Sequence, residues 1–366
     1  MAIVTAFRFT EKSGAICIDQ ESWHIWRRKT WFSDNIHLLV PEDLADQFGI
    51  ELVYAGTGHP PFHCDTAELA GQYIHQYVRH EHNPEETITV EMLGRIVLRA
   101  FQEVHSRRVN NKLQFLFGFT CDDFSRGEFQ QSDQTFHINQ EAVKERALQI
   151  INGKENTGYN PLSPPVEACL IGVDPKYGYS AFAIKENDGV LSFQSCWFES
   201  LGQGRDGAVI RFAKDLNDRF LDTRRKGKGL EKGLITLIEA TSVSMEHYGQ
   251  NGGSIRIVLV DAAGKRRQDR IKDIKDNSAR LSLEVVRAFR SGYLTEDVAA
   301  DLLKRLIANN ESFETVEKDM FRNASQPVML GKLLRGYKIC EGDLAGSKIE
   351  EHLFCQVEQT ARGGRK

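Results

Sequence analysis

Short apolar runs separated by polar turns dominate the first sixty residues of the chain. Residues 2–9 and 15–19 are rich in β-branched and aromatic side chains, and the polar, glycine-ending segment 10–14 separates them. Two such runs joined by a short turn predict a β-hairpin. Residues 2–58 as a whole are strand-rich. A strand that starts at residue 2 holds the α-amine at a sheet edge, which suits an N-terminal nucleophile because the amine can then act as its base.

Helical periodicity follows these strands. Apolar positions at helical spacing predict one helix over residues 66–80 and a second over 90–107, with Thr89 as the N-cap of the second. Strands are predicted again over residues 166–200 and over 254–261. Further predicted helices cover residues 140–151, 206–220 and 230–248. The mixture of strand runs and helix runs predicts the α+β fold class.

The segment at about residues 108–165 departs from this pattern. Within it, the apolar segment 113–119 predicts an extra strand, and the polar segment 125–137 predicts a loop. The proline-rich segment 160–165 has the composition of a linker.

A mainly helical extension is predicted at the C-terminal end. Thr295 and the two acidic residues after it predict the cap of an amphipathic helix. The apolar face of that helix contains Val298, Leu302, Leu306 and Ile307. The predicted organisation is a core over residues 1–262, with the insertion at about 108–165, followed by the extension over 263–366.

Several segments share their order and character with one known family. The hairpin strands end at Asp19, and later segments with family-like sequence are Asn35–Pro41, Tyr54–Gly58, Leu170–Asp174, Gly202–Gly204 and Gly252–Ile257. Together they resemble the proteasome β-type subunits of the N-terminal nucleophile (Ntn) hydrolase family. The resemblance implies a four-layer αββα sandwich with a C-terminal helical extension. Because the family connects the flanking elements more briefly, it also implies that the segment at about residues 108–165 is an insertion. It also implies assembly into a homo- or hetero-oligomeric ring.

The resemblance assigns the catalytic positions of the family one at a time. Asp19 falls on the family's aspartate, and Gly56 falls on the glycine whose N–H forms the oxyanion hole, so both are retained. Ala2 falls on the nucleophilic threonine, and Asn35 falls on the lysine that lowers the pKa of the nucleophile. Gln203, Tyr248 and Asn251 fall where the family uses a serine, an aspartate and a serine to support the terminal amine.

These departures remove the reacting side chains and keep the backbone positions. Alanine has no hydroxyl that can attack a carbonyl, and asparagine carries no positive charge. The leading prediction is a non-catalytic subunit, a pseudoenzyme, with a structural or regulatory role in a proteasome-like assembly. Its predicted partners are copies of itself, an active proteasome-like subunit or an unfoldase.

Two alternatives stay open. The first is an active threonine-type peptidase or amide-bond transferase whose nucleophile is nonstandard or was engineered away. The second is a monomeric module that binds a peptide or an acyl group in the cleft where the family has its catalytic site. A chain that starts at Thr5 would supply a nucleophile, but Thr5 lies too far along its predicted strand to meet Gly56.

Composition and charge exclude other classes of function. The formal net charge of −4 argues against a nucleic-acid partner, and no apolar run reaches bilayer length, which argues against a membrane partner. Seven cysteines without CxxC spacing favour reduced thiols and a cytoplasmic location. His59, His63 and Cys64 are metal-ligand types, but the two prolines between His59 and His63 argue against a helical ligand face, and we predict neither metal nor cofactor.

Overall fold

The computed structural model describes residues 3–19, 21–22, 31–32, 35–83, 86–152, 166–187, 190–202, 204–213, 229–247 and 255–335. The predicted hairpin is confirmed, because β1 (Val4–Arg8) pairs antiparallel with β2 (Ser13–Asp19). The hydroxyl of Thr10 closes the turn by accepting the amides of Lys12 and Ser13 at 3.1 and 3.0 Å. A polar residue in the turn thus supplies the bonds that a strand cannot make there.

Two antiparallel sheets of five strands each form the centre of the fold. Sheet I contains, in order, β12 (Phe198–Leu201), β1, β2, β13 (Ile255–Asp261) and β14 (Ile271–Ile274). Sheet II contains, in order, β11 (Val190–Ser195), β10 (Gly178–Asn187), β9 (Glu167–Asp174), β6 (Glu51–Thr57) and β5 (Ile36–Leu38). A separate short pair consists of β3 (Glu21–Ser22) and β4 (Trp31–Phe32). The architecture is therefore α+β with antiparallel sheets.

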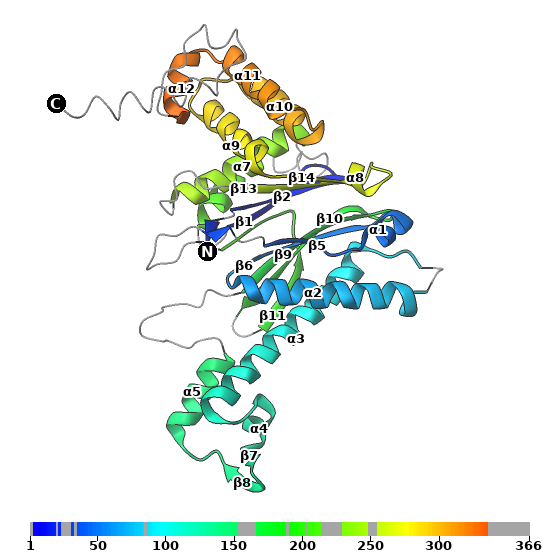
Figure 1. Ribbon diagram of the computed structural model, residues 1–366, viewed down its shortest axis with the longest axis vertical. Coiled ribbons are helices and arrows are strands. Elements are labelled where there is room, and N and C mark those ends of the chain that lie inside the picture. The colour runs from blue at the N-terminus through cyan, green and yellow to red at the C-terminus, as the bar shows by residue number, and fades with distance from the viewer. Residues whose placement is uncertain are drawn as a thin grey trace, which may run out of the picture. The chain divides into compact units, whose positions relative to one another are not determined.

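The two sheets pack face to face, and helices cover their outer faces (Figure 1). Inward-facing side chains of both sheets form one buried cluster, which includes Val4, Ile16, Val53 and Ile171. On the other face of sheet II, a second buried cluster joins it to α2 (Pro60–Gln76), the π-helix η1 (Tyr77–Glu81) and α3 (Val90–Phe117). On the other face of sheet I, α7 (Leu230–His247) packs on β1 and β2.

The first helix of this layer begins earlier than predicted. α2 starts at Pro60 rather than near residue 66, with the two prolines in its first turn. The sequence interpretation that these prolines prevent a helix at His59–Cys64 is wrong, because proline is tolerated at the first helical positions, where the N–H has no partner in any case. The predicted cap of α3 is confirmed, since the Thr89 hydroxyl accepts the amide of Met92 at 3.3 Å.

The inserted segment forms a small lobe on the second half of α3. It contains α4 (Cys121–Arg126), β7 (Glu128–Gln131), β8 (Gln134–His137) and α5 (Glu141–Ile151). The predicted helix over residues 140–151 is confirmed. The predicted strand over 113–119 is wrong, because α3 continues to Phe117. Apolar residues at every second position suggested a strand, but Leu113 is buried in the helix while Phe115 is 89% exposed on another side of it.

The predicted loop over residues 125–137 is also wrong, because it contains the β7–β8 hairpin. The hairpin turns at Ser132 and Asp133, whose φ angles of 48° and 62° are typical of a type I′ turn. The sequence gives little signal for this turn, because it lacks the Asn-Gly or Asp-Gly pair that usually marks one. Both strands are largely exposed, so their sequences also lack the alternation of apolar and polar residues that predicts a strand.

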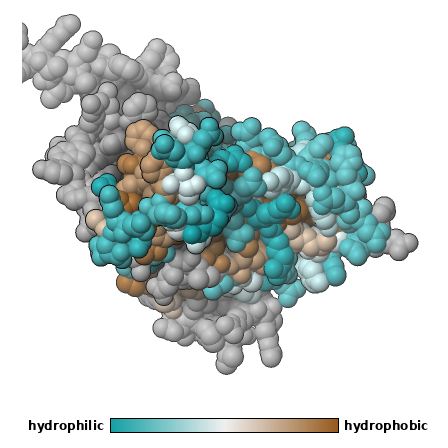
Figure 2. Space-filling model, turned by 90° about the horizontal axis from the view of Figure 1, so that it is seen from below, coloured by the Kyte–Doolittle hydropathy of each residue, from teal (hydrophilic) through white to brown (hydrophobic). Residues whose placement is uncertain are grey.

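The lobe has a core of its own and leaves apolar side chains on its surface. Its buried residues are Leu113, Phe119, Ile138, Ala147 and Ile150. Its exposed large apolar residues are Phe115, Leu116, Phe136 and Leu148. Figure 2 shows brown hydrophobic surface among teal polar surface on one face of the molecule. The lobe is thus a small folded element rather than a surface loop.

The C-terminal part is a compact helical unit that begins at Lys275. Its described helices are α9 (Asp276–Arg290), α10 (Glu296–Leu303), η2 (Lys304–Ala308), α11 (Phe313–Asn323) and α12 (Pro327–Arg335). Thr295 caps α10 by accepting the amide of Val298 at 3.4 Å, as predicted. The sequence placed the start of this unit at residue 263, but β14 pairs with β13 and keeps the chain in the first unit up to Ile274.

A buried ion cluster, the Arg270 cluster, connects three elements beside sheet II. Glu51, the first residue of β6, accepts two hydrogen bonds from Arg270, at 3.2 and 3.0 Å. Arg270 ends α8 (Arg267–Arg270) and also donates to the Ala45 carbonyl of α1 (Glu42–Phe48) at 2.8 Å. Arg270 is only 2% exposed, so its charge depends on these partners.

Candidate functional site

Three of the residues assigned by resemblance lie at one end of the stacked sheets. Asp19 ends β2, Asn35 precedes β5, and Gly56 lies near the end of β6. The amide of Asp19 donates to the Ile3 carbonyl at 3.0 Å, and the amide of Gly56 donates to the Asn35 carbonyl at 3.1 Å. Asp19 and Asn35 are both buried. Ala2, Gln203, Tyr248 and Asn251 lie outside the described residues.

The two sheets meet at this end through Arg256, which the sequence analysis did not single out. Arg256 lies on β13 of sheet I, directly opposite Ile18 of β2. Its Nη1 donates to the Ile36 carbonyl of sheet II at 3.1 Å, one residue after Asn35. Its Nε and Nη2 donate to the two carboxylate oxygens of Asp273, both at 2.8 Å. A charged residue inside the otherwise apolar strand Ile255–Val260 was the signal that would have found it.

A second ion pair lies at the same end. The Glu167 carboxylate, at the start of β9, is 3.4 Å from Nη1 of Arg205 and accepts the amide of Gly202 at 3.4 Å. Glu167 is opposite Thr57 in the sheet, one residue beyond Gly56. These contacts therefore tie the start of β9 in sheet II to Gly202, which follows β12, and to Arg205.

Gly56 has a packing role as well as a backbone role. A Cβ atom at this position would lie 2.0 Å from Nδ1 of His63 on α2. The imidazole therefore packs directly on the glycine, and no other residue fits without moving the ring. This packing explains the glycine without any catalytic requirement.

His63 makes two internal hydrogen bonds and is fully buried. Its Nδ1 lies 2.6 Å from the Tyr54 hydroxyl, and its Nε2 lies 2.9 Å from the Thr57 carbonyl. Since a carbonyl only accepts, Nε2 carries the proton and Nδ1 accepts from the tyrosine. Burial lowers the pKa of His63 from 6.5 to about 4, so the ring stays neutral at pH 7.

The three metal-ligand types near α2 do not form a joint site. His63 is engaged as above, Cys64 is exposed, and Nδ1 of His59 lies 3.0 Å from a guanidinium nitrogen of Arg108. In the described ranges, no group of three or more metal-binding side chains is found.

Thr5 is a buried residue in the middle of β1. It pairs with Cys17 on one side and with Ser200 on the other. Its hydroxyl donates to the Cys17 carbonyl at 3.2 Å and lies 2.5 Å from the Thr241 hydroxyl of α7. Burial raises the pKa of the Cys17 thiol to about 12, so this neighbour is not a thiolate. Thr5 and Cys17 therefore hold α7 against sheet I.

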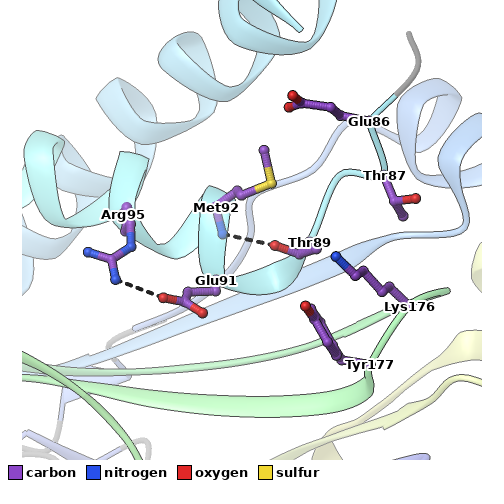
Figure 3. A pocket seen from close by; sticks show the side chains of 8 residues that line it. All are labelled: Glu86, Thr87, Thr89, Glu91, Met92, Arg95, Lys176 and Tyr177. Carbon is purple, nitrogen blue, oxygen red and sulfur yellow. Dashed lines mark hydrogen bonds and ion pairs between the residues drawn. The ribbon is translucent and has the colours of Figure 1, made fainter. Parts of the chain in front are cut away.

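A surface hollow of about 590 Å³ lies at the opposite end of sheet II from Gly56, at the start of α3 (Figure 3). Its lining residues are Glu86, Thr87, Thr89, Glu91, Met92, Arg95, Lys176 and Tyr177. Asp174 fixes its walls by accepting the amides of Val90, Lys176 and Tyr177 at 3.0, 2.9 and 2.7 Å. The two acidic and two basic side chains of the lining balance, so its charge favours neither anions nor cations.

The chain matches no protein-family model, and no curated protein matches it. Among the described residues, none of the helices has the length and apolar character needed to span a bilayer.

Proposed function

We propose that this chain is a non-catalytic subunit of a proteasome-like assembly, built on the αββα sandwich of the Ntn hydrolases. The layers support this fold, because α7, sheet I, sheet II and the α2–α3 layer follow one another. The role of such a subunit is structural or regulatory. It retains the end of the sheets at which the family has its catalytic site, but it lacks the nucleophile and the lysine that perform the family's reaction.

The observation that carries the proposal is the hydrogen bond between Gly56 and Asn35. The Gly56 N–H is the donor that the resemblance assigns to the oxyanion hole, and it points at the Asn35 carbonyl, 3.1 Å away. An amide that is paired in a sheet is not presented to a developing oxyanion. The residue that accepts this bond is the one that stands where the family has its lysine.

The electrostatics at this end also support a non-catalytic site. A nucleophile is activated by a nearby positive charge that is not neutralised. Arg256 is engaged with Asp273 at 2.8 Å, and Arg205 lies 3.4 Å from Glu167. Each guanidinium is thus paired with a carboxylate, and neither replaces the lysine as an activating charge.

A peptidase assay tests the absence of catalysis. The untagged full-length protein is incubated with a panel of fluorogenic peptides and with a β-lactone that acylates N-terminal threonine and serine hydroxyls. We expect no turnover above buffer and no mass increase, whereas an active threonine peptidase in parallel shows both. Turnover together with a probe attached to the first residue of the chain would establish the enzyme alternative.

Native mass spectrometry tests the assembly. We expect a ring-sized oligomer of the untagged protein, with the N-terminal residue read from the denatured mass. A single-protomer mass across the micromolar range would contradict assembly with itself. It would leave the inactive site unaffected and favour the monomeric binding module instead.

A further inference from the structure

We propose that Cys169 and Cys196 form a redox site, in which a hydroperoxide oxidises the two thiols to a disulfide. The inference goes beyond the proposed function, because it concerns sulfur chemistry between the sheets and none of the assigned catalytic positions. Both cysteines carry free thiols, and Cys169 is buried while Cys196 is partly exposed. The pair therefore combines one sulfur that an oxidant can reach with a second that solvent does not reach.

Cys196 lies where the chain crosses from sheet II to sheet I. It follows β11, and its N–H donates to the Ala181 carbonyl of β10 at 3.0 Å. The carbonyl of the next residue, Trp197, accepts the Arg8 amide of β1 at 3.1 Å. Both sheets thus hold the main chain at this point, and the Cys196 side chain packs against the buried cluster between them.

Cys169 faces the same space from β9. It belongs to the buried cluster on which Cys196 packs, and its thiol donates a hydrogen bond to the Cys196 sulfur. That hydrogen bond, together with burial, raises the pKa of the Cys169 thiol well above its usual range. Burial, and after it the two neighbouring thiols, also raises the pKa of Tyr179 on β10. Both sulfurs are therefore neighbours of one phenol ring as well as of each other.

An ion pair beside the two thiols joins the sheets. Nζ of Lys185 on β10 lies 2.7 Å from Oε2 of Glu199 on β12. Glu199 is opposite Ala6 of β1, which belongs to the same buried cluster as Cys169. Both charges lie close enough to act on the Cys169 thiol. Since each charge neutralises the other, the pair holds the two sheets together around the cysteines and does not activate a thiolate.

The proposed reaction has two balanced steps. The Cys196 sulfur attacks the O–O bond of the hydroperoxide and becomes a sulfenic acid, while the thiol proton passes to the alkoxide that leaves as an alcohol. The Cys169 sulfur then attacks the Cys196 sulfur, and its own proton passes to the hydroxide that leaves as water. The two sulfurs together lose two electrons, and these electrons reduce the hydroperoxide.

Peptide mass mapping of the untagged full-length protein tests the site. The folded protein is treated with increasing amounts of hydrogen peroxide, then unfolded, alkylated and digested. We expect two peptides joined through Cys169 and Cys196, two hydrogen masses lighter than the reduced pair, and we expect dithiothreitol to separate them. A sulfinic acid at Cys196 with Cys169 still alkylated would overturn the inference. So would a disulfide that joins either cysteine to a different one.

Two variants separate the pair from single thiols. Cys169→Ala removes the thiol that resolves the sulfenic acid, so the dose that joins the wild-type peptides should carry Cys196 to the sulfinic acid. Cys64→Ala is the matched control, because it removes an exposed thiol on α2, and it should leave the joined peptides unchanged. Equal oxidation of Cys196 in the wild type and in Cys169→Ala would contradict the inference.

The melting temperature gives a second readout that does not depend on Cys169→Ala folding. A disulfide would close the loop between β9 and the crossover, so peroxide should raise the melting temperature of the wild type by about 5–10 °C. Dithiothreitol should reverse the rise, and Cys196→Ser should show none. An equal rise in Cys196→Ser would show that another group is responsible. Neither outcome depends on peptidase activity or on assembly, so the proposed function stands or fails separately.

Discussion

At the scale of single residues, the contact between Gly56 and His63 gives the sharpest expectation. Gly56→Ala places a Cβ atom 2.0 Å from the imidazole, so ring and strand must move apart. We expect a loss of about 1–3 kcal/mol in the free energy of unfolding, measured by urea denaturation. Gly71→Ala in α2 is the matched control, because its Cβ would meet no atom closer than 3.9 Å. That change should be neutral or stabilising by about 0.5–1 kcal/mol, and an equal loss in both variants would refute the packing argument.

His63 gives a second expectation, for pH. Its pKa is 6.5 in an unfolded chain and about 4 in the folded protein, where burial disfavours the charged ring. Below pH 6.5 the unfolded state therefore binds more protons, and stability falls as the pH drops from 6.5 towards 4. The full effect of this one group is about 3 kcal/mol.

The measurement is urea unfolding at pH 7, 6 and 5, for the wild type and for His63→Gln. The variant lacks the titrating ring, so its stability should fall less steeply over this range. Parallel pH profiles would show that His63 is not the group responsible.

Residues also show where prediction from sequence succeeds and fails. Thr89 and Thr295 were predicted as helix caps, and both are, because capping depends on neighbours within three positions. The packing of His63 on Gly56 and the contact of Arg256 with Ile36 were not predicted. The second contact joins residues 220 positions apart, and only the folded topology brings them together.

At the scale of elements, the Arg270 cluster should behave as a buried ion pair. Glu51→Gln leaves the guanidinium of Arg270 without its buried carboxylate, and we expect a loss of about 3–5 kcal/mol in unfolding free energy. Asp43→Asn is the control, because its pair with Arg79 is half exposed and is worth about 0–1 kcal/mol. Comparable losses for the two variants would mean that burial does not determine the strength of these pairs.

The lobe gives an expectation for local stability. Leu113→Ala removes a buried side chain from the lobe core and should destabilise that element by about 2–5 kcal/mol. Hydrogen exchange followed by mass spectrometry should then show faster exchange over residues 109–151 and unchanged exchange in β2, β6 and β9. Faster exchange throughout both sheets would show that the lobe does not have a separate core.

Elements also explain which parts of the fold were predictable. The hairpin, α5, α7 and β13 were close to their predicted ranges because each has a clear apolar pattern of its own. The end of α3 and the β7–β8 hairpin were not predicted. Some of their apolar residues are exposed, so the apolar pattern of these segments does not show which side chains are buried. The helix predicted over 206–220 is described only over 205–213.

At the scale of the whole molecule, the chain divides into two compact units after Ile274. All four tryptophans precede that residue, at positions 23, 26, 31 and 197. Tryptophan fluorescence therefore reports unfolding of the first unit, while far-ultraviolet circular dichroism reports both units. We expect the two urea transitions not to coincide, because each unit has its own core. Superimposable transitions would show that the units unfold as one.

The length of α3 has a mechanical consequence. This one helix has 28 residues, about 42 Å at 1.5 Å per residue, and its two halves are buried in different cores. An uninterrupted ladder of main-chain bonds resists bending far more than a loop of the same length. A force applied to the lobe is therefore transmitted along α3 to the helices that cover sheet II, because no flexible segment lies between the two halves of the helix.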